Sequence, residues 1–146
     1  MKIAPARVGA RKEVSMGKKI VIGGVLVFIA WAVLDFVIHV LILGGTYAQQ
    51  PELWRPQAEM KIGVMYVAVL IAALAFAALW GWFVSDRTPV NGAKFGLVWG
   101  IGMGVSMGYG TYAVMPIPYH MALVWFLGTV VEAVVAGLIV GAVVRD

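Results

Sequence analysis

Three ionisable residues fall inside long apolar stretches of the sequence, where such side chains are uncommon. Asp35 and His39 lie four residues apart within residues 20–43, and Glu132 lies near the middle of residues 119–144. A spacing of four places a carboxyl and an imidazole on the same face of an α-helix, one turn apart. In that arrangement the two groups can share a proton or hold a cation.

The two carboxyls are predicted at a similar depth in their helices. Asp35 lies 15 residues after Ile20, and Glu132 lies 13 residues before Arg145. With a rise of 1.5 Å per residue, both positions are about 20 Å from the same end of the helices. An acidic side chain in the middle of a membrane costs about 2.5–3.5 kcal/mol. We therefore expect the carboxyls to be neighbours that pair, share one proton or meet a cation, with at least one of them neutral at pH 7.

Other polar side chains are predicted in the same half of the helices. The candidate site therefore consists of Asp35, His39 and Glu132, with Tyr109, Tyr112 and His120 as second choices. Two interpretations need no cofactor, and these are a buried hydrogen-bond network and a proton- or cation-handling site that opens outward. Two others need one: a divalent metal on Asp35, His39, Glu132 and His120, or a b-type haem between His39 and His120. We expect no cofactor, because no metal-ligand motif supports either.

Other kinds of chemistry find little support. The absence of Cys excludes disulfides, Cys-based zinc sites and Cys nucleophiles. Neither a nucleophile elbow nor a phosphate-binding loop is present, so we expect no enzymatic activity. The basic residues are too few and too far from aromatic residues to indicate nucleic-acid binding.

The composition is typical of an integral membrane protein. Of the 146 residues, 62% are hydrophobic and 12% are charged, half the charged fraction of about 25% in soluble domains. Four apolar runs predict helices at residues 20–43, 62–84, 95–115 and 119–144, each long enough to cross a bilayer. Short connections make successive helices antiparallel neighbours. The predicted fold is an all-α, integral membrane, antiparallel four-helix bundle over residues 20–145.

The distribution of Lys and Arg predicts the orientation of this bundle. Six basic residues precede the first run, and Arg87, Lys94 and Arg145 lie on the same side, whereas Arg55 and Lys61 lie on the other. Nine against two predicts that both termini are cytoplasmic. Residues 44–60 are then outside, and the expected location is the bacterial inner membrane.

The segments outside the helices have distinct expected roles. Residues 1–19 form a basic tail that we expect to be disordered, and Met16 is an alternative translation start to Met1. Tyr47 and Trp54 are expected to anchor the outer loop at the membrane surface. Residues 85–94 contain an Asn-Gly pair and are predicted to form a turn.

Small residues predict where helices approach one another closely. In the third predicted helix, glycines recur at intervals of four: Gly96, Gly100, Gly104 and Gly108. The fourth helix has a weaker series with the same spacing, which consists of Ala133, Gly137 and Gly141. In lipid, small residues let backbones come into contact. The stripe predicts a helix–helix contact, within the bundle or between protomers.

The sequence resembles small bacterial four-helix inner-membrane proteins without an assigned activity. The resemblance lies in residues 34–39 (LDFVIH), 53–56 (LWRP), 59–60 (EM), 109–112 (YGTY) and 116–119 (PIPY). It implies a bacterial inner-membrane location, and it assigns no activity and no catalytic residue to this chain. We expect a non-enzymatic accessory or structural subunit in the lipid bilayer, as a homo-oligomer or in a larger complex. The alternative is an oligomeric transporter or channel component for protons, cations or small solutes.

Overall fold

The structure, a computed structural model, describes residues 14–145, and all of its regular structure is helical. The all-α class predicted from the sequence is therefore confirmed. The long helical segments are α1 (Met16–Asp35) with the π-helix η1 (Phe36–Ile42), α3 (Ile62–Phe83), α4 (Pro89–Gly104) with the π-helix η4 (Val105–Gly110) and α5 (Thr111–Val114), and α6 (Tyr119–Val143). Between η1 and α3 lie the short helix α2 (Gly44–Ala48) and the 3-10 turns η2 (Pro51–Leu53) and η3 (Gln57–Glu59).

Three segments are long and apolar enough to cross a membrane: Met16–Ile42, Ile62–Phe83 and Tyr119–Val143. The segment formed by α4, η4 and α5, residues 89–114, covers most of the span predicted at residues 95–115, and it is not among the candidates found in the described part of the chain. The reason is compositional, because the glycines that let this segment pack closely also lower its mean hydropathy.

Two helices begin earlier than the sequence predicted. α1 begins at Met16 and not at Ile20, because Ser15 caps it and accepts a hydrogen bond from the Lys18 backbone N–H at 3.4 Å. Residues 16–19 are thus helical, and residues 1–13 of the predicted tail lie outside the described residues.

α4 also begins early, at Pro89 and not at Phe95. Thr88 Oγ1 accepts from the Asn91 backbone N–H at 3.2 Å, and proline is well suited to the first position of a helix. The Asn91-Gly92 pair therefore lies in the first turn of α4. The prediction that residues 85–94 form a turn was wrong from Pro89 onwards.

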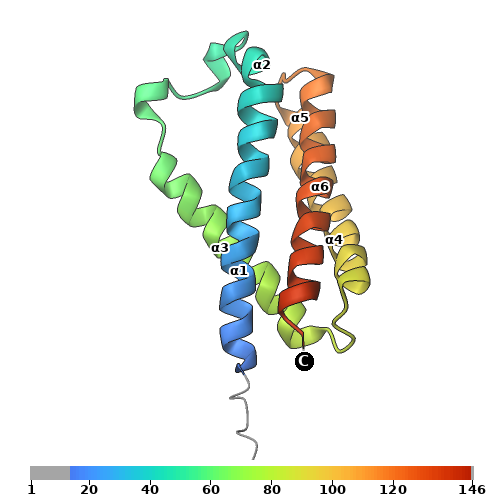
Figure 1. The fold of residues 1–146 in the computed structure, drawn as a ribbon. Coiled ribbons are helices and arrows are strands. Elements are labelled where there is room, and N and C mark those ends of the chain that lie inside the picture. The colour runs from blue at the N-terminus through green and yellow to red at the C-terminus, as the bar shows by residue number, and fades with distance from the viewer. Residues whose placement is uncertain (1–13, 146) are drawn as a thin grey trace, which may run out of the picture.

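Successive long segments run in opposite directions (Figure 1). α6 lies between α1 and α4, and the ends of α1 and α6 meet where Lys19 Nζ donates to the Arg145 carbonyl at 2.6 Å. We call this end the base, and we call residues 44–60, at the opposite end, the cap.

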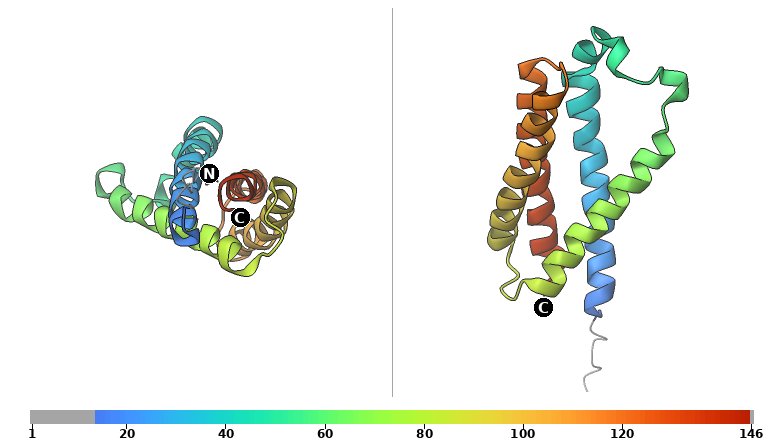
Figure 2. Two further views of the ribbon diagram at one scale, coloured as in Figure 1. Left: turned by 60° about the horizontal axis from the view of Figure 1, so that its bottom comes forward. Right: turned by 180° about the vertical axis from the view of Figure 1, so that it is seen from behind.

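The predicted closed bundle forms only near the base. α3 crosses α1 obliquely, and its cap-side half leans away from α4 and α6 (Figures 1 and 2). The buried residues of α3 all lie in its second half: Ala73, Phe76, Ala77, Trp80 and Gly81. By contrast, Val64, Val67 and Ile71 are 65%, 57% and 62% exposed.

Two apolar cores lie at different heights in the molecule. The core near the base centres on Phe76 and Trp80 of α3, whose rings contact Phe95 of α4 at centroid distances of 5.1 and 5.7 Å. The second core lies under the cap and includes Leu43, Met121 and Trp125. These two cores leave a polar level between them.

The glycine stripe of α4 and η4 faces α6. A Cβ on Gly100 would lie 2.8 Å from Val130 Cα, and one on Gly96 would overlap the Ala133 carbonyl oxygen. The same close approach is found at Gly104, Gly108, Gly137 and Gly141. The contact lies within one chain. It fixes α4 and η4 against α6, and so holds one wall of the polar level.

Candidate functional site

A polar cavity of about 130 Å³ lies between the two cores. Its lining comes from three helical segments of the chain: Asp35, Ile38 and His39 from the continuous segment α1–η1, Met107 from η4, and Trp125, Gly128, Thr129 and Glu132 from α6. The structure therefore brings together Asp35, His39 and Glu132, the three first-choice residues of the sequence analysis.

Charged and polar groups face each other across this cavity. His39 Nε2 lies 3.7 Å from Asp35 Oδ1, and the two side chains are 41% and 35% exposed. The Asp35 carboxyl is close enough to Glu132 for their charges to interact. Glu132 Oε1 is buried without a hydrogen-bond partner in the described part of the chain. Such an oxygen is costly to leave unpaired, and it can be satisfied by a proton shared with a neighbouring carboxyl.

An aromatic side chain links α1 to α6 at the level of Glu132. Trp31 Nε1 donates to the Glu132 backbone carbonyl at 2.9 Å, which ties α1 to α6 at this level. The Trp31 ring also contacts the Phe76 ring edge-on, at a centroid distance of 5.9 Å. Apolar packing therefore separates the cavity from the base.

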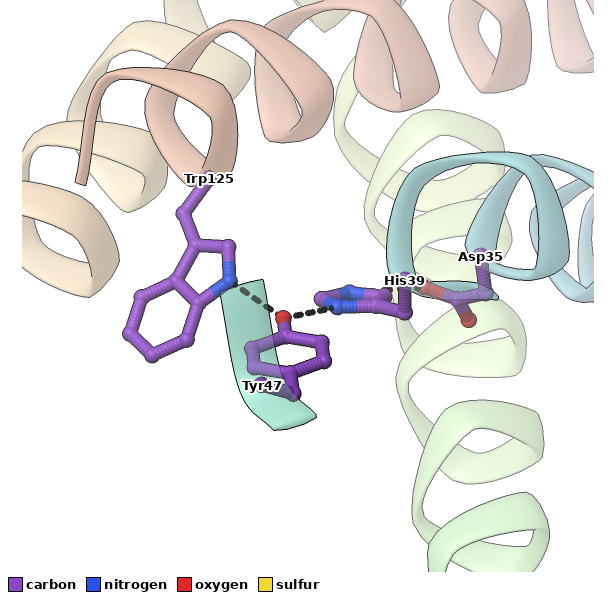
Figure 3. A network of polar contacts seen from close by, with 4 residues as sticks. All are labelled: Asp35, His39, Tyr47 and Trp125. Carbon is purple, nitrogen blue, oxygen red and sulfur yellow. Dashed lines mark hydrogen bonds and ion pairs between the residues drawn. The ribbon is translucent and has the colours of Figure 1, made fainter. Parts of the chain in front are cut away.

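On the cap side, a hydrogen-bonded network continues from His39. Tyr47 Oη lies 2.6 Å from His39 Nδ1 and accepts from Trp125 Nε1 at 2.8 Å (Figure 3). Burial raises the pKa of the Tyr47 phenol above its ordinary value, although the N–H donated by Trp125 acts in the opposite direction. Tyr47 is thus a neutral hydroxyl at physiological pH.

Both π-helical segments adjoin the cavity. His39 lies in η1, where the Leu43 backbone N–H donates to the Ile38 carbonyl at 2.9 Å, and Met107 lies in η4. π-helical turns are rare and frequently occur at functional sites. Here the π-helical turns of η1 and η4 change the directions of the side chains on two facing helices, at the level of the cavity. The sequence carries no pattern that predicts them.

The second-choice residues lie elsewhere. Tyr109 Oη is 3.4 Å from Tyr119 Oη, and the Tyr112 ring contacts the Tyr119 ring edge-on. His120 Nε2 lies 3.0 Å from Thr46 Oγ1. Tyr109, Tyr112 and His120 are therefore near the connection between α5 and α6, and none of them lines the cavity. The sequence grouped these three residues with the carboxyls by depth alone, and the directions of their side chains place them away from the cavity.

The cofactor interpretations gain no support. No group of three His, Asp or Glu side chains in the described residues is arranged to hold a metal ion. The two imidazoles contact different hydroxyls, His39 that of Tyr47 and His120 that of Thr46, which does not suit haem ligation between them.

The two cap aromatics that were expected to be surface anchors pack against each other and against α6. The Tyr47 ring contacts the Trp54 ring at a centroid distance of 5.0 Å, and Trp54 contacts Trp125 at 6.3 Å. Tyr47 and Trp54 thus pack over the cap-side end of the cavity.

Two residues of the network, Trp125 and Tyr47, were not assigned to the site from the sequence. Trp125 precedes Glu132 by seven residues, a spacing that places both on one face of a helix, so it could have been found. Tyr47 could not, because its position depends on the fold of α2.

No protein-family model matches the chain, and no significant match was found among curated proteins or solved structures. Function is therefore inferred from the residues of the cavity.

Proposed function

We propose that this chain is a multi-pass membrane protein that binds protons at the Asp35–Glu132 carboxyl pair, with access from the cap side. One observation carries the proposal, namely the convergence of Asp35, His39 and Glu132 in one cavity between two apolar cores. Ionisable residues inside membrane helices are expensive, and they mark proton or ion pathways by default.

The chemistry of the cavity suits protons better than larger cations. Two carboxyls that interact can hold one proton between them, and an imidazole titrates near neutrality and exchanges protons rapidly. Apolar cores lie on both sides of the cavity, but only on the cap side does a polar group, the Tyr47 hydroxyl, connect to it through His39. We therefore propose that the site loads and releases protons on the cap side, and that coupling to transport needs a conformational change or a partner.

The proposal includes a specific placement in the membrane. Residues 89–114 cross the membrane in addition to the three candidate spans, between α3 and α6 in chain order. A helical segment of this length spans about 39 Å, which is more than a bilayer core of about 30 Å. Both termini lie in the cytoplasm of a bacterium and the cap lies outside, as the Lys and Arg distribution favours.

Infrared difference spectroscopy of the purified protein tests the proton site. Acidification from about pH 8 to about pH 5 should produce the carbonyl band of a carboxyl that gains a proton in apolar surroundings. Glu132→Gln should remove this band. The matched control Glu59→Gln changes an exposed carboxyl of the cap and should keep it. An unchanged band in Glu132→Gln would contradict the proposal.

A second candidate is a non-enzymatic accessory subunit of a larger membrane complex. It is favoured by the cap-side half of α3, which leans away from the other helices and exposes Val64, Val67 and Ile71. A neighbouring subunit could pack on this face. Val67→Trp should then reduce the size of the complex isolated in mild detergent. Val98→Trp, at an exposed position of α4, should not. Wild-type protein that is always monomeric would exclude this candidate.

A further inference from the structure

One direction of the hydrogen bonds around Tyr47 gives every donor an acceptor. An indole N–H can donate but not accept, so Trp125 must donate to Tyr47 Oη, at 2.8 Å. His39 Nδ1 lies 2.6 Å from the same oxygen. If His39 donated here as well, the hydroxyl proton of Tyr47 would have no acceptor among the described residues, so Tyr47 is assigned as the donor to His39.

This direction determines the tautomer of His39. A neutral imidazole that accepts at Nδ1 carries its proton on Nε2. In the structure Nε2 is the atom that faces Asp35, at 3.7 Å from Oδ1. The proton of neutral His39 is thus held on the side of the carboxyl pair, and the free lone pair is on the side of the cap.

We propose that Tyr47 is the proton donor through which protons from the cap side reach His39, and that Trp125 fixes the direction of this transfer. The inference rests on the proposed function, because it names the route by which the Asp35–Glu132 pair is loaded.

The transfer balances without any further reactant. The Tyr47 O–H bond breaks as an Nδ1–H bond forms, and Tyr47 Oη takes a replacement proton from a hydronium ion on the cap side, which leaves water. The resulting imidazolium gives its Nε2 proton to the Asp35 carboxylate, and His39 is then neutral with its proton on Nδ1. The starting tautomer returns afterwards by proton exchange with solvent, in which Nε2 gains a proton from hydronium and Nδ1 releases its proton to water. The side chain of His39 is 41% exposed, which permits this exchange.

The surroundings of His39 favour an inward transfer. The titratable groups facing it in the described part of the chain are Asp35 on its own helical segment, Glu132 across the cavity on α6, and Tyr47 on α2. The residue of η4 that lines the cavity is Met107, which is uncharged. Both carboxyls lie away from the cap, so they attract the positive charge of the imidazolium towards the interior.

The first test is nitrogen NMR of histidine-labelled protein at neutral pH, with His39→Gln to assign the signals. The wild type should show His39 with its proton on Nε2 and a hydrogen-bonded Nδ1. Tyr47→Phe should give a mixture of tautomers. Trp125→Phe, which removes the N–H and keeps an aromatic ring, should do the same if Tyr47→Phe folds poorly. A wild-type His39 with its proton on Nδ1 would overturn the inference.

The second test is the rate of proton uptake after a jump to acidic pH, followed by the carboxyl infrared band. Tyr47→Phe should slow uptake about 100-fold and keep the final amplitude, because general acid catalysis is lost and the carboxyls remain. Tyr109→Phe, which changes a tyrosine outside the cavity, should keep the wild-type rate. An unchanged rate in Tyr47→Phe would overturn the relay. The absence of any amplitude in the wild type would instead overturn the proposed function.

Discussion

At the scale of single residues, the cavity is organised by what each group can donate or accept. Trp125 can only donate, Tyr47 can do both, and His39 can do either at each nitrogen. A chain of hydrogen bonds is biased towards one direction when the group at one end of it can only donate. Trp125 supplies that fixed end, and it is also 8% exposed and therefore well held in the core under the cap.

Tyr47 gives a prediction for alkaline pH. Burial raises the pKa of its phenol, so the folded protein holds this proton more tightly than the unfolded chain does. The folded state is therefore favoured below the ordinary value of about 10, and it loses stability as the pH rises through the raised value. We expect the wild-type melting temperature to fall more steeply above about pH 10 than that of Tyr47→Phe.

Phenolate absorbance provides a direct measurement of the same effect. The difference between the titration curves of wild-type protein and Tyr47→Phe isolates the Tyr47 ionisation, and its midpoint should lie above about 10. A midpoint at or below that value would show that the phenol is not buried as described.

The sequence predicted the acidic part of the site but not the network above it. Asp35, His39 and Glu132 could be singled out because ionisable groups are costly in apolar helices, and their spacing and depth indicate that they can meet. Tyr47 lies in the loop outside the apolar runs, where an aromatic residue indicates a surface anchor and not a member of the site. Its role arises only when α2 folds back over the cavity.

At the scale of secondary structure, the apolar runs and prolines located most helix ends. α3 begins at Ile62 and α6 at Tyr119, as predicted, because Pro116 and Pro118 prevent the preceding helix from continuing. The early starts of α1 and α4 depend on capping by Ser15 and Thr88, which extends helices into polar sequence. The π-helical turns depend on tertiary packing and were not predictable.

The contact between α4 and α6 gives a prediction with a control on the same helix. Gly96→Ala places a Cβ on the Ala133 carbonyl oxygen, so the two backbones must separate. The expected loss in the free energy of unfolding is about 3 kcal/mol, at the upper end for overpacked sites. Gly102 has nothing within 4 Å of a Cβ, and Gly102→Ala should be stabilising by about 0.5–1 kcal/mol because alanine favours the helix.

Chemical unfolding in detergent micelles, followed by circular dichroism, measures both variants. Equal stability of Gly96→Ala and Gly102→Ala would mean that the stripe does not pack against α6 in the membrane. A selective loss in Gly96→Ala would also displace η4, and hence Met107, from the cavity wall.

At the scale of the whole molecule, the two ends of the described chain are held together. The hydrogen bond from Lys19 to the Arg145 carbonyl, 2.6 Å long, places the start of α1 beside the end of α6. Two ends on one side of a membrane require an even number of crossings. The three candidate spans alone would give an odd number, and the proposed function therefore assigns the additional crossing to residues 89–114.

Fusions to a reporter enzyme that is active only outside the cytoplasm test this argument. We predict activity for a fusion after Gln57, in the cap, and none for fusions after Asp86 or Asp146. If residues 89–114 did not cross, α6 would leave the chain outside, and the fusion after Asp146 would be active while that after Asp86 was not. Activity after both Asp86 and Asp146 but not after Gln57 would instead reverse the orientation, and the proton site would then load from the cytoplasm. The basic residues near the base oppose that reversal, because translocating each of them is unfavourable.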